Sequence, residues 1–273
     1  MSQSRKVAVV TGASSGIGQA MAKQLAAHHY DLVLIARRQD RLEALAAEIN
    51  RIHGVDTFVL AGDVTQTSFI ESIVPLCKSR FGRIDLLFQA AGYGVFKRAT
   101  QFSYAEIVAM FEVNTFAIMY LSQLVALEML DQGSGQIVMV ASSAGKLSTI
   151  ASSVYSATKA AVIAYADTLR LELRPAGIEV IVVNPGPVVT EFFDRDANSK
   201  AYFKTIEGFA LDVDVLTKRI MANLLSHCKF KREVNAPLVL ELLARLNSIF
   251  PTISDILKLN LFNLKENSDE TTV

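Results

Sequence analysis

Six short apolar runs, spread over the first two thirds of the chain, constrain the fold most strongly. They are rich in valine, isoleucine and leucine, and they alternate little with polar residues. Strands of this composition are buried on both faces, as in a parallel sheet that is covered by helices. We therefore expect one parallel sheet, with strands at VAVV (7–10), LVLIA (32–36), TFVLA (57–61), IDLLF (84–88), QIVMVA (136–141) and EVIVV (179–183).

Segments with helical patterns separate these runs. Ser103 and Glu106 form a capping box at the start of the fourth segment, and Pro175 with Gly177 ends the fifth. Regular alternation of strands and helices predicts an α/β fold, a Rossmann-like doubly wound parallel sheet with helices on both faces. The expected helices lie near residues 17–28, 39–53, 67–81, 103–131 and 153–174.

The bulk composition excludes several classes of protein. A chain of 273 residues that is 51% hydrophobic and 20% charged can bury a large core. Its 27 basic and 27 acidic residues balance, and no basic cluster indicates a nucleic-acid partner. Cys77 and Cys228 show neither metal-ligand spacing nor a disulfide framework, so we expect no metal site and a reducing, cytoplasmic location. We expect neither a signal peptide nor a clear transmembrane helix.

A glycine-rich turn, TGASSGIG (11–18), follows the first expected strand and opens the first helix. Gly12, Gly16 and Gly18 have no side chains, so the backbone can approach a pyrophosphate at the helix N-terminus, where free N–H groups favour an anion. The spacing differs from the better-known G-x-G-x-x-G, and an ordinary tight turn is the alternative. Its place on the first strand and helix favours a dinucleotide site.

The end of the second strand indicates which dinucleotide binds. Sites that prefer NAD carry an acidic residue there, which bonds the ribose 2′-OH. Here Ala36 is followed by Arg37 and Arg38, and a guanidinium can pair with a 2′-phosphate. This favours NADP(H), with a solvated basic helix start as the alternative. Asp63, just after the third strand, could reach the adenine, although aspartate is also common in turns.

Further motifs complete an ordered set: TGASSGIG (11–18), AAG (90–92), Asn114, Ser142, YSATK (155–159) and NPGPVVT (184–190). In this order and approximate spacing they resemble the classical short-chain dehydrogenase/reductase family, in its NADP-preferring form. The resemblance covers about residues 5–190 well and the remainder loosely. One departure is Ala90, where the family more often has asparagine; this removes a side-chain bond and leaves the backbone turn.

The resemblance implies hydride transfer between a nicotinamide and a carbonyl or secondary alcohol, with Tyr155 as general acid/base. Tyr155 and Lys159 share one face of a helix. A nearby cation stabilises a phenolate, so we expect Lys159 to lower the pKa of Tyr155 below its ordinary value of about 10. Ser142 could bond the substrate oxygen and the developing alkoxide, with Ser143 as the fallback.

The resemblance also assigns cofactor contacts. Lys159 would hold the nicotinamide ribose, Asn114 would position a water in a proton relay, and Thr190 with the backbone near Val188 would hold the carboxamide. Taken singly, Ser142 is typical of a turn residue at a strand end and Tyr155 of a half-buried aromatic residue, while Asn114 could equally bond a neighbouring backbone group. The expected cofactor-binding residues are Gly12, Ser14, Ser15, Gly16, Ile17, Gly18, Arg37, Arg38, Asp63, Val64, Ala90, Ala91, Gly92, Asn114, Tyr155, Lys159, Pro185, Gly186, Val188 and Thr190.

The Tyr-x-x-x-Lys spacing occurs a second time, at Tyr93 and Lys97. This copy includes Gly94 and lies between a strand and the capped helix that begins after Ser103. We expect a loop there, with no helical register to align the two side chains. Its side chains could still line the mouth of a pocket, because the loop lies at the carboxyl edge of the sheet.

The segment after Thr190 contains five aromatic residues in a polar stretch, and by resemblance it is a substrate loop that closes over the site. The aromatic residues favour an apolar or bulky substrate; alternatively they only anchor the loop. The expected pocket residues are Tyr93, Phe192, Phe193 and Phe203, with Tyr202 and Phe209 in the same segment.

An unusually apolar segment follows at 237–262, where Pro237 opens a helix, Pro251 ends it, and Thr252 with Asp255 could cap another. It could pack over the substrate pocket or a partner subunit, which we favour. It could instead lie on a membrane, although its polar face has few Lys and Arg residues, or be ordinary core.

The expected organisation is therefore a single domain over 1–273. It comprises a dinucleotide-binding and catalytic core at about 5–190, a substrate loop and C-terminal helices at about 191–265, and a disordered tail at 266–273. The expected partners are a small carbonyl or alcohol substrate and, by resemblance, a second or further copies in a homodimer or homotetramer. The alternative function is a non-catalytic NADP(H)-binding regulator on the same scaffold.

Overall fold

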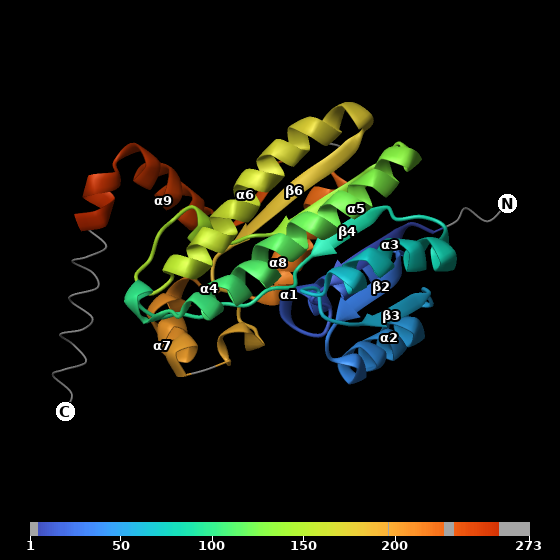
Figure 1. Ribbon diagram of the computed structural model, residues 1–273, viewed down its shortest axis with the longest axis horizontal. Helices are drawn as coiled ribbons and strands as arrows, with labels where there is room; N and C mark the ends of the chain where they lie inside the picture. Colours follow the sequence, from blue (N-terminus) through green and yellow to red (C-terminus); the bar gives the residue numbers. More distant parts are fainter. Residues whose placement is uncertain (1–4, 196, 227–231, 257–273) are drawn as a thin grey trace.

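The strands of the protein form one parallel sheet (Figure 1). This computed structural model describes residues 5–195, 197–226 and 232–256. Within these ranges the strands are β1 (Val7–Thr11), β2 (Asp31–Ala36), β3 (Thr57–Ala61), β4 (Leu86–Gln89), β5 (Gly135–Val140), β6 (Ile178–Pro185) and β7 (Glu233–Ala236). The six runs expected from the sequence are confirmed. The sequence did not predict β7, a short edge strand in which only Val234 and Ala236 are buried.

The order of the strands creates a natural binding position. The order is β3-β2-β1-β4-β5-β6-β7, and all neighbours pair in parallel. The chain therefore builds outward in one direction from β1 and then returns to build from β4 in the other. Ligands of open α/β sheets bind outside the carboxyl ends of the strands at such a reversal.

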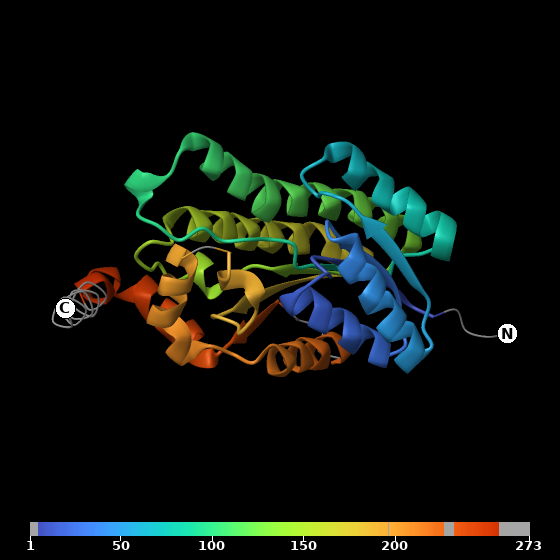
Figure 2. The same cartoon turned by 90° about the horizontal axis from the view of Figure 1, so that it is seen from below.

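Helices cover both faces of the sheet (Figure 2). Within the described ranges the named helices are α1 (Gly16–Ala27), α2 (Gln39–His53), α3 (Thr67–Phe81), α4 (Tyr104–Phe111), α5 (Ala117–Gln132), α6 (Ser153–Leu173), α7 (Ala197–Ile206), α8 (Val213–Leu225) and α9 (Leu238–Ile249). Alternate residues of β1 enter opposite cores: Ala8 and Val10 pack with α1, α2 and α8, whereas Val7 and Val9 pack with α3, α5 and α6. This two-sided burial confirms the expectation from the apolar runs.

The fourth predicted helix differs from the expectation in one respect. Its capping box is confirmed, since Glu106 N donates to Ser103 Oγ (3.3 Å) and Ser103 N donates to Glu106 Oε2 (2.8 Å). However, α4 and α5 are joined by a π-helical turn, Glu112–Phe116, with Asn114 in its middle. Such turns insert an extra residue and are frequent at functional sites, and apolar periodicity alone does not reveal them.

The continuous helical stretch Tyr104–Gln132 is long and apolar enough to meet the criteria for a membrane span, contrary to the expectation from the sequence. However, 56% of the most apolar 18-residue window of this stretch is buried inside the protein. Burial of α5 against α3 and α6 explains this composition, because a core helix is apolar on several sides.

The C-terminal helices partly follow the prediction. α9 begins directly after Pro237 and ends at Ile249. Pro251 starts a further helical segment, 251–256, so Thr252 lies within that segment rather than capping it. This agrees with the preference of proline for the first turn of a helix. Cys228, residues 257–262 and the predicted tail at 266–273 lie outside the described residues.

Candidate active site

A cavity of about 950 Å³ opens at the carboxyl ends of the strands, close to the reversal between β1 and β4. A pocket of this size can enclose most of a small ligand, and this one is long enough to include both the glycine turn and the loops near α7 and α9. We refer to its two parts as the cofactor side, around β1 and β2, and the substrate side, around Tyr155, α7 and α9.

The glycine turn has the geometry that a phosphate group needs. Gly12 has φ +68°, and an added Cβ there would lie 2.8 Å from the Ala90 backbone. A Cβ at Gly18 would collide with the carbonyl of Gly12. α1 begins at Gly16, so its free N–H groups face the cavity that the glycines line. The turn therefore offers a narrow cradle that fits a pyrophosphate.

Arg38 is already held at the cofactor side. Its Nη2 donates to Ser14 Oγ (3.0 Å) and Ser15 Oγ (2.8 Å), and its Nη1 lies 3.4 Å from Glu191 Oε2. Arg41 Nη1 lies 2.8 Å from the same Glu191 oxygen. The sequence interpretation did not single out Arg41 or Glu191, because their pairing joins α2 to a turn about 150 residues later.

The other predicted cofactor residues also border this side. Those that line the cavity are Ser14, Ser15, Ile17, Arg37, Asp63, Val64, Ala90, Ala91, Gly92, Pro185, Gly186, Val188 and Thr190. Asp63 Oδ1 accepts from Thr65 N (2.9 Å), so this carboxylate also fixes the turn after β3. Thr190 packs over the glycine turn, where an added Cβ at Gly16 would lie 3.4 Å from its methyl group.

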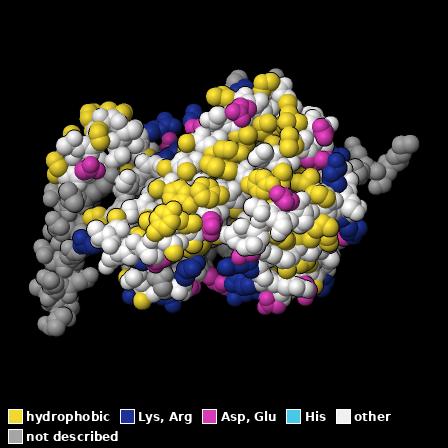
Figure 3. Space-filling model, viewed as in Figure 1, with side chains coloured by type: hydrophobic (Ala, Val, Ile, Leu, Met, Phe, Trp, Pro, Cys, Tyr) yellow, Lys and Arg dark blue, Asp and Glu magenta, His cyan; other side chains and the backbone are white. Residues whose placement is uncertain are grey.

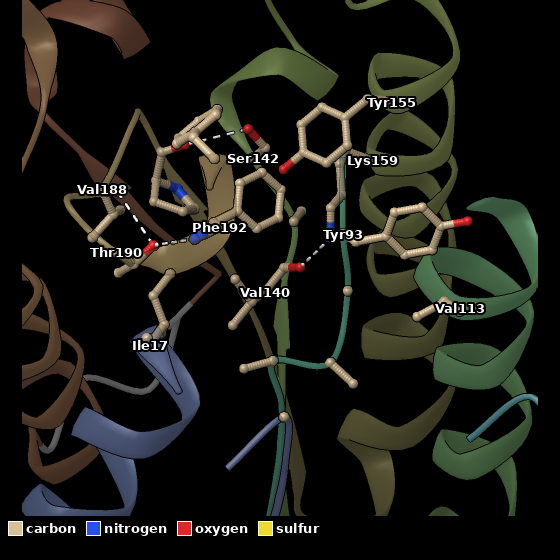
Figure 4. Close-up of a pocket in the computed structure, with 18 of the residues that line it drawn as sticks. Ile17, Tyr93, Val113, Val140, Ser142, Tyr155, Lys159, Val188, Thr190 and Phe192 are labelled. Carbon is tan, nitrogen blue, oxygen red and sulfur yellow. Dashed lines mark hydrogen bonds between the residues drawn. The ribbon is translucent and has the colours of Figure 1, made fainter. Parts of the chain in front are cut away.

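Tyr155 and Lys159 lie together at the centre of the cavity (Figure 4). Both come from the first turns of α6, as the i and i+4 spacing predicts, and they are only 8% and 4% exposed. Lys159 Nζ lies 5.8 Å from the centroid of the Tyr155 ring and donates to the carbonyl of Val140 (3.0 Å). The carbonyl of β5 thus holds the ammonium group in place.

Burial controls the protonation of both groups. It raises the pKa of the Tyr155 phenol above its ordinary value, and a hydrogen bond with Ser142 acts in the opposite direction. Burial also lowers the pKa of Lys159 to about 8. The sequence interpretation expected Lys159 to lower the pKa of Tyr155; in the protein alone the shift is upward, because the loss of water around the phenolate dominates. Tyr155 is therefore protonated at neutral pH.

Ser142 follows β5 and points into the same cavity. Its Oγ accepts from Ala144 N (3.1 Å) and donates to the carbonyl of Pro185 (3.4 Å). These bonds fix the hydroxyl next to Tyr155. Ser143 also lines the cavity and is less buried.

Asn114 does not reach the cavity. It is completely buried, and its Oδ1 accepts from Tyr93 N (2.9 Å) while its Nδ2 donates to Tyr93 O (2.8 Å) and Thr158 Oγ1 (3.1 Å). The π-helical turn directs this side chain at the loop after β4. Asn114 therefore holds the backbone of Tyr93 and the side chain of Thr158, which directly precedes Lys159. The prediction that Asn114 positions a water in a proton relay did not include these hydrogen bonds.

Aromatic side chains form the wall of the substrate side. Tyr93, Phe192 and Phe193 line the cavity, whereas Phe203 packs behind Phe193 with ring centroids 4.8 Å apart. Phe96, which was not predicted, stacks on Tyr202 at 4.2 Å and also contacts Tyr155. Further lining residues are Arg195, Ile206, Phe209, Leu240 and Leu243. Leu240 and Leu243 support the interpretation that the C-terminal helices pack over the substrate pocket.

The second Tyr-x-x-x-Lys copy is a loop, as expected. Tyr93 and Lys97 lie between β4 and α4 with no helix to align them. Lys97 Nζ instead pairs with Glu106 Oε1 (2.6 Å), and only Tyr93 contributes to the cavity lining. The guanidinium of Arg195 lies 4.1 Å from the centroid of the Tyr93 ring.

Comparison with known proteins decides the family. The sequence model of the short chain dehydrogenases matches residues 6–201. An uncharacterised oxidoreductase of Staphylococcus epidermidis is 36% identical over 185 residues, which are 68% of this chain and 79% of the relative. The chain belongs to the short-chain dehydrogenase family. It is therefore a member of an oxidoreductase family.

Solved structures of the short-chain dehydrogenase family have the same architecture. A short-chain dehydrogenase from Sphingobium yanoikuyae in complex with NADPH superposes with a TM-score of 0.78 at 29% identity, covering 92% of this chain and 95% of that one. The bulky-bulky ketone specific alcohol dehydrogenase from Comamonas testosteroni superposes with a TM-score of 0.75 at 26% identity, covering 93% and 94%. The glycine cradle and the NADPH complex of the Sphingobium protein support a nicotinamide cofactor.

Proposed function

We propose that the protein is an NADP(H)-dependent oxidoreductase that interconverts a carbonyl compound and its secondary alcohol. The observation that carries this proposal is that Tyr155, Lys159 and Ser142 line the same cavity as the glycine turn. A bound nicotinamide would supply the hydride for reduction or accept it in the reverse direction. The chain's own residues handle the proton and orient the carbonyl.

In reduction, Tyr155 gives its phenolic proton to the carbonyl oxygen as that oxygen gains charge. The raised pKa keeps the proton on Tyr155 at neutral pH, so the donor is in the required state. Ser142 orients the same oxygen by turning its hydroxyl proton away from the long bond to Pro185 O (3.4 Å), while Ala144 N keeps its Oγ in place. Lys159 in its charged form stabilises the phenolate that proton transfer leaves, which offsets the cost of burial.

Two arginines support the choice of NADP(H) over NAD(H). Arg37 and Arg38 follow β2 at the place where NAD-preferring sites carry an acidic residue. Arg38 is fixed by Ser14 and Ser15 beside the glycine turn, where a 2′-phosphate would pair with it. The NADPH complex of the Sphingobium protein is consistent with this assignment.

An apolar or bulky substrate suits the aromatic wall. Phe96, Phe192, Phe193 and Tyr202 pack in one aromatic cluster with Tyr155 and give this part of the cavity an apolar wall. The bulky-ketone specificity of the Comamonas enzyme supports the same substrate class.

Association into a homodimer or homotetramer accounts for exposed apolar side chains on α4, α5 and α6. Hydrophobic side chains gather on the face seen in Figure 3. The exposed apolar side chains of α4, α5 and α6 include Tyr104 (82% exposed), Leu127 (55%) and Leu171 (71%). Sedimentation velocity is the measurement, and the proposal predicts a dimer or tetramer at micromolar concentration. A monomer under those conditions would contradict it.

The test of the function is oxidation of NADPH and NADH against a panel of ketones and aldehydes, with cofactor binding followed by fluorescence. We expect turnover with at least one bulky apolar ketone and tighter binding of NADPH than of NADH. Equal affinities would contradict the choice of cofactor. Tight NADPH binding without turnover across the panel would favour the non-catalytic regulator instead.

A further inference from the structure

A partly buried ion-pair cluster lies outside the cavity and connects three of the segments around it. Lys146 Nζ lies 2.5 Å from Glu233 Oε2 on β7 and 3.0 Å from Glu241 Oε2 on α9. The side chains of Lys146, Glu233 and Glu241 are only 20%, 14% and 14% exposed, so they are largely removed from water. Because desolvation offsets much of the attraction, such a cluster fixes geometry more clearly than it adds stability.

On one side the cluster is anchored on the turn that carries Ser142. Lys146 N donates to Ser143 O (3.0 Å), and Gly145 N donates to Ser142 O (3.0 Å). Ala144 N, in the same turn, donates to Ser142 Oγ (3.1 Å). These hydrogen bonds within the turn itself hold Ser142, so the turn is a fixed anchor from which Lys146 reaches the two glutamates.

On the other side the cluster controls the wall that α9 contributes. Glu241 follows Leu240 directly and precedes Leu243 by half a turn, and both leucines line the cavity. Leu240 packs closely on the chain after β6, since an added Cβ at Gly186 would lie 2.6 Å from Leu240 Cδ1. Arg245 Nε donates to Glu241 Oε1 (2.9 Å) and holds the carboxylate toward Lys146.

A second branch of hydrogen bonds returns to Ser142. Asn235 Nδ2 donates to Glu233 Oε2 (3.0 Å), and Asn184 Nδ2 donates to Asn235 Oδ1 (2.8 Å). Asn184 precedes Pro185, whose carbonyl accepts from Ser142 Oγ (3.4 Å). The ends of β6 and β7 are thus part of the same network.

We propose that Lys146 is a positioning residue for the substrate side. It clamps α9 onto the turn that carries Ser142, so that Leu240 and Leu243 form a fixed wall for the apolar part of the substrate that lies away from its carbonyl. Lys146 itself is not among the residues that line the cavity. The wall affects only substrates large enough to reach it, and this inference rests on the proposed function for its effect on turnover.

The first test measures the clamp without turnover. Hydrogen–deuterium exchange of the full chain compares wild type with Lys146→Met, which keeps an unbranched apolar stem and removes the charge. We expect the α9 peptide, 238–249, to exchange about tenfold faster in Lys146→Met, because Glu233 and Glu241 lose their shared cation. Lys146→Arg should restore protection, since a guanidinium can reach both carboxylates.

The second test separates KM from kcat with two probes, benzylacetone as a bulky ketone and butanone as a small one. Lys146→Met should raise KM for benzylacetone about tenfold while kcat changes less than about twofold. KM for butanone and the affinity for NADPH should stay within about twofold of wild type, and Lys146→Arg should restore KM for benzylacetone.

A matched control removes an ion pair elsewhere. Lys23→Met breaks the pair between Lys23 and Glu48 (2.8 Å) on α1 and α2, and neither α9 exchange nor KM should change. Unchanged α9 exchange in Lys146→Met, or an equal effect in Lys23→Met, would overturn the clamp. If wild type reduced neither ketone, the exchange result would still decide the clamp, and the proposed function would be tested by the wider panel.

Discussion

The cofactor side and the substrate side of the cavity are built in different ways. The cofactor side consists of strand ends and the first turn of α1, held by backbone bonds of the sheet and by glycines that tolerate no side chain. The substrate side consists of loops, short helices and α9, held by aromatic contacts and the Lys146 cluster. Rigid elements suit a constant ligand, whereas loops on a rigid scaffold allow one fold to serve many substrates.

Substitution of Tyr155, which lies between the two sides, should have the largest effect. In Tyr155→Phe the proton donor is lost, so kcat/KM for ketone reduction should fall about 10³-fold. NADPH affinity should change less than about twofold, because the phenol is not needed to hold the cofactor side. Undiminished turnover in this variant would contradict the assigned role. Weakened NADPH binding would show that the two sides are less independent than the structure indicates.

Protonation of Lys159 should set the pH dependence. Burial lowers the pKa of Lys159 to about 8, so its charge is present below that pH and is lost above it. We expect kcat/KM for reduction to be constant below pH 8 and to fall about tenfold per pH unit above it. Lys159→Arg should move the fall to higher pH, because a guanidinium stays protonated. A fall at the same pH in both proteins would assign it to another group.

The lowered pKa of Lys159 also predicts that the free energy of unfolding depends on pH. Between pH 8 and 10.5 the unfolded chain keeps the proton of Lys159 and the folded protein releases it. The unfolded state then binds more protons, so the contribution of Lys159 to the free energy of unfolding should rise with pH across this window. Urea unfolding at several pH values measures it. Lys159→Met should lack this rise, and an equal rise in both proteins would contradict the assignment.

A change confined to the substrate side should affect KM alone. Phe192 contacts Tyr155 and Phe193, with ring centroids 5.8 Å and 5.0 Å apart. Phe192→Ala should raise KM for a bulky aryl ketone about tenfold, from the loss of buried aromatic surface. KM for butanone serves as the internal control and should change little. Equal increases for both ketones would indicate that Phe192 supports the loop rather than the substrate.

The smallest effect is expected for Glu191 on the cofactor side. This carboxylate pairs with Arg38 and Arg41 at the place proposed for a 2′-phosphate, and its side chain is 55% exposed. Exposed ion pairs contribute little, so Glu191→Gln should tighten NADPH binding by no more than about fivefold and leave NADH binding unchanged. Glu48→Gln, which breaks the pair with Lys23, is the matched control. Glu191 and the 2′-phosphate of NADPH would compete for the same guanidinium groups. Weaker NADPH binding in Glu191→Gln would contradict this competition.

The contrast between the two sides also explains what the sequence could predict. The glycine turn, the six strands and the pair at Tyr155 and Lys159 are each formed by residues close together in the sequence. Their relative positions therefore follow from the local helix or strand conformation, which the sequence pattern predicts. The family resemblance covered this part of the chain for the same reason. These features were therefore placed correctly in the fold from the sequence alone.

The remaining features depend on contacts between distant segments. Leu240 reaches the cavity only because β7 brings α9 beside the chain after β6. Asn114 looked like a polar residue in a regular helix, and the π-helical turn that directs it at Tyr93 leaves no trace in apolar periodicity. Phe203 was one of several aromatic residues in its segment, and only packing shows that Phe193 separates it from the cavity. The pKa of Tyr155 depends on burial, which motif spacing does not report.

Transfer of deuterium from NADPH that carries deuterium at both C4 positions of the nicotinamide tests the central claim most directly. Wild-type protein is incubated with the labelled cofactor and a bulky aryl ketone, and the alcohol is analysed by mass spectrometry. We expect one deuterium on the carbinol carbon with wild type, and about 10³-fold slower formation of this product with Tyr155→Phe at saturating cofactor. Bound NADPH that transfers no deuterium to any ketone of the panel would contradict the account.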